Sequence, residues 1–298
     1  MNTIRMQEKP TFTHLILSGG SGKGILYIGA LRYLQQENHY KTIKYIYGTS
    51  IGSIFATFFG LNISMGDIEN EFKNYFDELK CSELNILSFL KDYGIIKTED
   101  NSLLLIVKKI LKKYNYENYT FVDFAKRTGI QLNIKSVHYE TFKTFTFNVD
   151  NSPNVLLIDA IGASTALPIL FKPYKIGNEL YIDGGLTENI PITIENNINS
   201  NNILILISLT EENNAKIVDN STIFNYIINM MNILTMNMNI RLLLQKKYKY
   251  FICFENYPIG FFPYKISEDG KINCTVTKQQ IEDSVIAGYE QIYEKLKI

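Results

Sequence analysis

Short apolar segments alternate with longer segments of helical periodicity along most of the chain, a pattern typical of α/β proteins. Apolar runs of strand length occupy Thr13–Ser18, Ile43–Tyr47 and Ile203–Leu209, and such short runs between turn residues indicate buried strands. After the first of them, Gly24–Gln36 places apolar residues at helical spacing, which predicts an amphipathic helix. The second strand is followed by an apolar helix that reaches Phe59.

The rest of the chain continues this alternation. Asp67–Phe124 is predicted to be mostly helical, as an insertion or cap, and Gln131–Tyr139 with Lys143–Val149 predicts a hairpin. The further predicted elements are a helix from about Val155 to Ser164, a strand at Leu180–Ile182, a helix at Thr222–Leu244, a strand at Lys249–Glu255 and a helix from Lys278. Two strands each lead through a glycine turn into a helix, which predicts a ligand site at that edge of the sheet.

Composition narrows the possible classes of protein. With 298 residues, 46% of them hydrophobic, the chain has enough apolar surface for a core and is not intrinsically disordered. Its 30 basic and 30 acidic residues leave no net charge for binding nucleic acid. Cys81, Cys253 and Cys274 form no paired framework, which favours a reducing compartment. The polar Met1–Pro10 and the lack of long apolar runs predict a cytoplasmic protein without signal peptide or transmembrane segment.

Gly48–Gly52 (Gly-Thr-Ser-Ile-Gly) joins the second strand to the next helix, as the G-x-S-x-G nucleophile elbow does. A serine on such a tight turn needs very small residues two positions before and after it. The turn exposes Oγ of Ser50, and the N-terminus of the following helix stabilises negative charge that develops beside it. The pattern predicts a catalytic Ser50, although five residues alone also match simple glycine turns.

A serine nucleophile requires a base, and the histidines are poorly placed for that role. His14, His39 and His138 all lie before the late position at which an α/β-hydrolase carries its catalytic histidine, so we interpret them as structural or surface residues. The remaining candidate is Asp183, at the end of a short strand and followed by two glycines that allow positive φ and close backbone approach. To act as a base, Asp183 needs direct contact with the serine and partial desolvation.

Ser18–Gly24 (Ser-Gly-Gly-Ser-Gly-Lys-Gly) is the third candidate element of a site. Consecutive small residues leave backbone N–H groups free to converge on an anion, either a phosphate or the oxyanion of an acyl intermediate. A nucleotide P-loop is excluded, because Leu17 stands where its first glycine is required and Gly24 stands where Ser or Thr should hold magnesium. The dinucleotide-binding pattern G-x-G-x-x-G is also broken, because Ser21 occupies the position of its middle glycine. An oxyanion hole remains compatible, because it needs backbone amides rather than particular side chains.

These motifs together resemble those of the patatin-like phospholipases, which are serine lipid acyl hydrolases with a Ser-Asp dyad. Leu17–Gly24 is similar to the oxyanion loop of that family, and Gly48–Gly52 to its nucleophile elbow. Ala163–Pro168 resembles the segment that precedes the catalytic aspartate, and Asp183–Gly185 with Asn189 resembles the family's Asp-Gly-Gly block. The resemblance covers nearly the whole chain, and four motifs in the right order make it specific.

The resemblance implies that Ser50 is the nucleophile and Asp183 its base. The implied residues of the oxyanion hole are Gly19, Gly20, Ser21 and Gly22. The residues implied to support the motifs are Gly48, Gly52, Lys23, Gly24, Gly184 and Gly185. Ser21 departs from the family pattern by replacing the third glycine of the loop, and its Cβ would crowd the acyl oxygen. We nevertheless expect its N–H to donate, with activity reduced modestly if at all.

The family implies a three-layer α/β/α fold with a central, mostly parallel sheet and a nucleophile elbow. We predict a catalytic domain over residues 13–210, to which residues 211–298 add a helix, a strand and a helix. The implied activity is phospholipase A-type hydrolysis of acyl esters in membrane phospholipids, without cofactor or metal. The implied substrate is a phospholipid or another acyl-ester lipid, and peripheral contact with a membrane is implied as well. An activating protein is compatible with this function, and nucleic acid is not an expected partner.

Three segments are candidates for contact with the membrane: Thr222–Leu244, the lysines at 108, 109, 112 and 113, and Phe261–Tyr264. Each also has a simpler interpretation: the first segment as a helix packed on the sheet, the lysines as a solvated helix face, and the aromatic residues as a cap on the core. Two other classes of function remain. A catalytically weakened lipid-binding or scaffold protein is compatible with Ser21, and a nucleotide-binding protein is the poorer third hypothesis.

Overall fold

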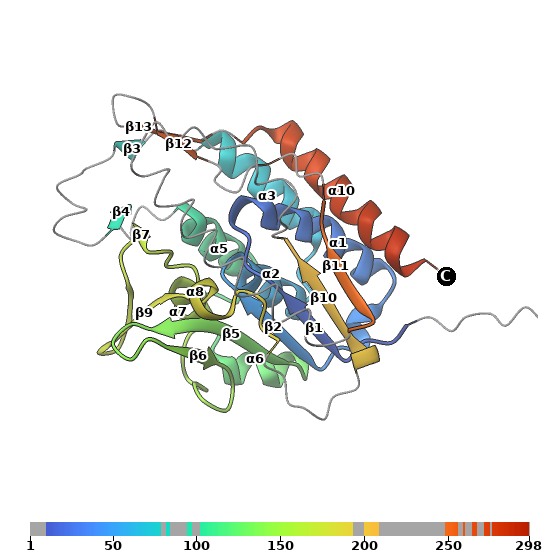
Figure 1. The fold of residues 1–298 in the computed structure, drawn as a ribbon, viewed down its shortest axis with the longest axis horizontal. Coiled ribbons are helices and arrows are strands. Elements are labelled where there is room, and N and C mark those ends of the chain that lie inside the picture. Colours follow the sequence, from blue (N-terminus) through green and yellow to red (C-terminus); the bar gives the residue numbers. More distant parts are fainter. Residues whose placement is uncertain are drawn as a thin grey trace, which may run out of the picture.

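The computed structural model describes residues 10–78, 82–83, 94–96, 102–192, 200–208, 248–255, 259, 264–266, 271–274 and 276–297. Its centre is a sheet with the strand order β11-β10-β1-β2-β5-β9-β8, in which β6 also pairs with β5 (Figure 1). The strands of this sheet are β1 (His14–Leu17), β2 (Tyr45–Thr49), β5 (Gln131–His138), β6 (Lys143–Phe147), β8 (Tyr174–Ile176), β9 (Glu179–Asp183), β10 (Ile203–Ile207) and β11 (Tyr250–Cys253).

The sheet is mostly parallel, as predicted, and is flanked by helices. The strands from β11 to β5 pair in parallel, whereas β6, β9 and β8 add an antiparallel side. Residues of β1 and β10 are buried on both faces, which explains why their sequences are continuous apolar runs. Leu15 and Leu17 enter the larger hydrophobic cluster, and Ile16 between them enters the smaller cluster on the opposite face.

Helices cover this sheet and connect its strands. They are η1 (Ser21–Ile25, 3₁₀), α1 (Leu26–Gln36), η2 (His39–Lys41, 3₁₀), α2 (Ile51–Gly60), α3 (Met65–Glu78), α5 (Ser102–Lys113), α6 (Phe121–Thr128), α7 (Leu157–Ser164), α8 (Gly185–Glu188), η4 (Ser200–Asn202, 3₁₀) and α10 (Lys278–Leu296). Small strand pairings outside the main sheet involve β3 (Ser82–Glu83), β4 (Gly94–Ile96), β7 (Ile169–Phe171), β12 (Tyr264–Ile266) and β13 (Lys271–Cys274). None of the described helices is both long and apolar enough to cross a bilayer.

Most predicted elements are confirmed, with three differences. The helix expected from Gly24 begins earlier, as the 3₁₀ turn η1 that leads into α1. The region expected to be mostly helical contains α3, α5 and α6, and also the short strands β3 and β4. The strands β7, β8, β12 and β13 and the helical turns η2, α8 and η4 are not predicted, because three or four residues are too few to establish a periodicity. The helix expected at Thr222–Leu244 lies outside the described residues.

The C-terminal helix α10 packs closely along α1. Two glycines permit this contact: a Cβ at Gly29 would lie 1.8 Å from the backbone oxygen of Val285, and one at Gly288 would lie 2.0 Å from that of Leu26. The α-helices α1 and α10 therefore form a pair whose backbones almost touch, on the outside of the sheet (Figure 1).

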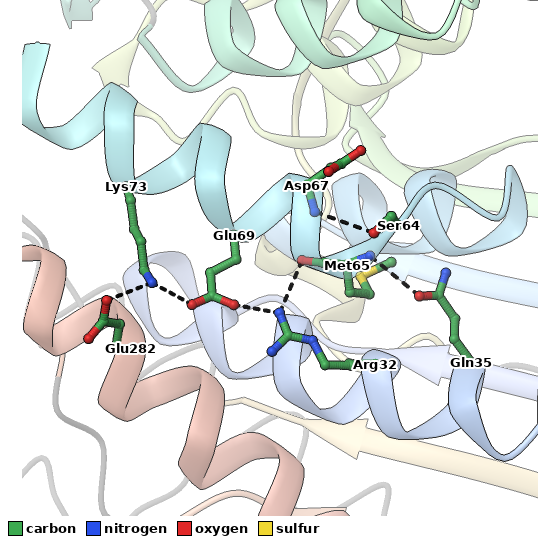
Figure 2. A network of polar contacts seen from close by, with 8 residues as sticks. All are labelled: Arg32, Gln35, Ser64, Met65, Asp67, Glu69, Lys73 and Glu282. Carbon is green, nitrogen blue, oxygen red and sulfur yellow. Dashed lines mark hydrogen bonds and ion pairs between the residues drawn. The ribbon is translucent and has the colours of Figure 1, made fainter.

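A polar network ties these two helices to α3, as Figure 2 shows. Glu69 of α3 accepts hydrogen bonds from Arg32 of α1 at 2.5 Å and from Lys73 at 2.6 Å. Lys73 also contacts Glu282 of α10 at 2.7 Å. Single exposed ion pairs contribute little to stability, but this shared arrangement fixes α3 against both helices.

Candidate active site

The candidate nucleophile lies on a strained turn between β2 and α2. Ser50 has φ 51° and ψ −126°, a backbone conformation that non-glycine residues adopt only where the surroundings enforce it. A Cβ at Gly52 would lie 2.4 Å from a backbone oxygen of β1, and one at Gly48 would lie 2.6 Å from the backbone of α2. The steric requirement expected for the elbow is therefore present at both glycines.

Asp183 contacts Ser50 directly. Oγ of Ser50 donates to Oδ2 of Asp183 at 2.6 Å, and the N–H of Gly185 donates to Oδ1 at 2.7 Å. Only 3% of Asp183 is exposed. Burial raises the pKa of Asp183 to about 6, although the hydrogen bonds from Ser50 and Gly185 favour the ionised form. At neutral pH, Asp183 is therefore an ionised carboxylate and a stronger base than an ordinary aspartate.

The glycine after Asp183 is required for close approach and not, as the sequence also allowed, for positive φ. Gly184 has φ −64°, which any residue adopts. A Cβ at Gly184 would lie 2.4 Å from the backbone oxygen of Lys135 in β5. The absence of a side chain lets the turn after β9 lie flat against β5, where Asp183 pairs with Ser136.

Ser164 at the end of α7 holds the backbone of the nucleophile. The N–H of Ser50 donates to Oγ of Ser164 at 2.9 Å, and Ser164 donates to the carbonyl of Lys135 at 2.6 Å. Both bonds are consistent with a role in maintaining the strained turn. This role of Ser164 was not predicted; its signal in the sequence is a serine at the end of an otherwise largely apolar helix.

A buried ion pair joins β5 to α8 near the nucleophile turn. Nζ of Lys135 in β5 is 3.0 Å from Oε2 of Glu188 in α8, and each side chain is only 8% exposed. The carbonyl of Glu188 also accepts from Oγ1 of Thr49, the residue before the nucleophile. The sequence did not predict this pair, because Lys135 stands at a polar position of a strand in which polar and apolar residues alternate.

The peptide between Gly19 and Gly20 has a fixed orientation. The carbonyl of Gly19 accepts from the side chains of Ser18 at 2.9 Å and of Asn189 and Ser208 at 3.3 Å each. In a trans peptide the next N–H points the opposite way, so the N–H of Gly20 is directed away from these donors. The N–H of Gly19 donates to the carbonyl of Asn189 at 3.0 Å. Gly19 is therefore not available as an oxyanion donor, which corrects that part of the prediction.

The next three N–H groups of the loop are better candidates. Within the described part of the chain, the N–H groups of Gly20, Ser21 and Gly22 have no acceptor, because the first N–H bonded along η1 is that of Lys23. The loop lies against the nucleophile, since a Cβ at Gly19 would be 3.2 Å from Cβ of Ser50. Such N–H groups beside a serine Oγ are suited to bind an oxyanion.

The two other motif residues of this loop, Lys23 and Gly24, are both buried. Lys23 is buried, which lowers the pKa of its ammonium group to about 8. A Cβ at Gly24 would lie 2.4 Å from the side chain of Ile51. Gly24 therefore lets the loop lie close to the start of α2.

Ser21→Gly is expected to leave the activity within about a hundredfold of wild type, or ~2.7 kcal/mol in the barrier. Ser21 has φ 49°, a left-handed conformation that glycine adopts without strain, so unfolding should cost up to about 1 kcal/mol more in the variant. Urea unfolding and ester hydrolysis measure both effects. A larger gain in activity would mean that the Ser21 side chain obstructs the oxyanion site.

The histidines make contacts away from Ser50. The ring of His14 stacks on Tyr45, and His39 is buried. His138 contacts Glu179 at 2.5 Å. These contacts agree with their interpretation as structural or surface residues. Among the described residues, no group of three or more His, Cys, Asp or Glu side chains is arranged to hold a metal.

Comparisons with known proteins agree on one family. The family model described as patatin-like phospholipase matches residues 15–195. The probable lipid hydrolase 463L of Invertebrate iridescent virus 6 is 28% identical over 197 residues, which cover 65% of this chain and 67% of the viral protein. The calcium-independent phospholipase A2-gamma of Homo sapiens is 27% identical over 208 residues, which cover 59% of this chain but 24% of the human protein.

Solved structures support the fold. VipD from Legionella pneumophila aligns with a TM-score of 0.51 at 16% identity, over 96% of this chain and 67% of that chain. At this level of identity the likeness concerns the arrangement of the sheet and helices and carries no statement about activity.

Proposed function

The chain belongs to the patatin-like phospholipase family, and we propose that it is a phospholipase A-type acyl hydrolase acting through Ser50 and Asp183. The observation that carries the proposal is the contact of 2.6 Å between Oγ of Ser50 and Oδ2 of Asp183. The relatives named as a lipid hydrolase and a phospholipase support a lipid substrate. We also propose that residues 13–210 and 211–298 form one catalytic domain.

In the proposed cycle, Asp183 takes the proton of Ser50 while Oγ attacks the ester carbonyl. The N–H groups of Gly20, Ser21 and Gly22 stabilise the oxyanion that forms. When the intermediate collapses, the proton on Asp183 passes to the departing alcohol or lysophospholipid. Asp183 then takes a proton from water, whose oxygen attacks the acyl-enzyme, and returns that proton to Ser50 as the fatty acid leaves.

The pH profile tests the role of Asp183. Because the base must be ionised, and burial raises the pKa of Asp183 to about 6, kcat/KM is expected to be constant at neutral pH and to fall about tenfold per pH unit below about 6. A soluble short-chain ester should be the substrate, so that membrane binding does not contribute. A midpoint near 4 would mean that the carboxylate is not desolvated in solution.

The test of the function is acyl release from phospholipid vesicles whose sn-1 and sn-2 chains are distinguishable, with Ser50→Ala as the matched control. We expect release by the wild type alone and fluorophosphonate labelling that requires Ser50. Labelling without release would point to a missing activating protein or a different ester. The absence of both labelling and release would overturn the proposal, and it would favour a lipid-binding or scaffold protein with this fold.

A further inference from the structure

The turn between β5 and β6 presents aromatic residues to solvent. Phe142 is 75% exposed, the highest value for a large hydrophobic side chain among the described residues, and Tyr139 at the start of the turn is 40% exposed. Phe142 also has a left-handed backbone, with φ 55°, which glycine or asparagine adopts at much lower cost. The backbone of Phe142 costs stability and its exposed ring lowers solubility. Such a residue typically serves to contact another molecule.

This turn is held in one conformation. Nδ1 of His138 accepts from the N–H and Oγ1 of Thr141 at 3.3 and 3.1 Å. With Nδ1 as the acceptor, Nε2 carries the proton and donates to Glu179 of β9 at 2.5 Å. The N–H of Phe142 donates to the carbonyl of His138 at 2.9 Å. The aromatic residues are therefore displayed on a preorganised turn and not on a loose loop.

The turn projects beyond the edge of the sheet that carries the candidate site. β5 runs parallel to β2, and Asp183 pairs with Ser136 of β5. From Ser136 the chain continues for three more residues to Tyr139, which is about 10 Å at ~3.3 Å per residue. Figure 1 shows the β5–β6 hairpin extending to the left, past the ends of β1 and β2.

We propose that the turn Tyr139–Phe142 inserts into the interface of a lipid bilayer and brings Ser50 to the acyl esters. This inference rests on the proposed function and names the surface through which that site reaches its substrate. Phenylalanine and tyrosine are suited to the boundary between headgroups and acyl chains. A tip that reaches about 10 Å beyond the site would bring the nucleophile near the depth of the esters.

The charges around the turn balance. Lys143 and Lys175 are exposed, and so are Glu140 and Glu179. The tip thus has no excess of either charge to attract anionic lipid. Insertion is therefore driven by burial of the aromatic rings, and we expect it on zwitterionic phosphatidylcholine vesicles and at high salt.

The lysines of α5 are the competing surface. Lys109 and Lys113 lie 3.1 and 3.2 Å from Glu71 of α3, so part of this positive charge is neutralised within the fold. A membrane contact through α5 would require anionic lipid and would weaken in salt. The two surfaces therefore differ in a measurable way.

A single tryptophan reports on insertion, because the chain contains none. Phe142→Trp is expected to show blue-shifted emission with phosphatidylcholine vesicles. The control Phe251→Trp should not, since Phe251 is 52% exposed but lies on β11 at the opposite edge of the sheet. An unchanged spectrum for Phe142→Trp would overturn the proposal. So would a shift that needs anionic lipid and disappears in salt.

Phe142→Gly separates insertion from folding and from chemistry. Because glycine suits the left-handed turn, the variant should keep or raise its Tm, while its partition onto phosphatidylcholine vesicles falls roughly tenfold to a hundredfold. Hydrolysis of a soluble short-chain ester should be unchanged. Unchanged vesicle binding, with ester hydrolysis still dependent on Ser50, would overturn this inference alone. Vesicle binding that requires Phe142, without any serine-dependent hydrolysis, would support the surface and overturn the proposed function.

Discussion

Asp183→Asn is expected to lower ester hydrolysis by about 10²- to 10⁴-fold and, at neutral pH, to stabilise the fold. The amide keeps the shape of the carboxyl group but takes no proton from Ser50. The gain in stability follows from burial, which raises the pKa of Asp183 to about 6, against near 3.9 in the unfolded chain. An ionised group with that difference costs the folded state about 3 kcal/mol, and asparagine removes the cost.

The effect of Asp183→Asn on stability depends on pH. A raised pKa means that Asp183 binds its proton more tightly in the folded state than in the unfolded chain. The stability gained from this proton is complete below about pH 4 and is lost as the pH rises through about 6. Urea unfolding should therefore show the variant more stable near pH 8, with the difference vanishing near pH 4. Asp283→Asn, on the exposed face of α10, is the control and should change neither property. Retained hydrolysis in Asp183→Asn would contradict the dyad.

Lys135→Met is expected to destabilise the protein by about 3–5 kcal/mol. The substitution leaves Glu188 buried without the ammonium group that lies 3.0 Å from it. Activity should fall as well, because Glu188 also fixes Thr49 beside the nucleophile. The free energy of unfolding, measured in urea, is the test.

A double-mutant cycle identifies the cause of that loss. Adding Glu188→Leu to Lys135→Met should recover most of the stability, since replacing both members of a buried pair by apolar residues is often neutral. Lys113→Met is the matched surface control, because Lys113 is 47% exposed, and it should cost at most about 1 kcal/mol. Equal losses in Lys135→Met and Lys113→Met would show that the pair is hydrated in solution.

The sequence was sufficient to predict the longer elements of the fold and the candidate dyad. Strands such as β1 and β10 are buried on both faces, so they are apolar runs that periodicity detects. Ser50 and Asp183 are recognisable because their turns need glycine at fixed spacings, and steric exclusion of Cβ is a local property that the sequence records directly. The order of the four motifs added the specificity that each motif lacks.

Contacts between distant segments were decided only by the tertiary structure. Ser164 and Lys135 support the site through bonds to residues far away in the chain, and no local pattern encodes such a partner. The N–H of Gly19 is withdrawn from the oxyanion site because Asn189 lies beside it. The exposure of Phe142 depends equally on what does not pack against it. Local steric needs are written in neighbouring residues, whereas hydrogen-bond partners and burial depend on which segments the fold brings together.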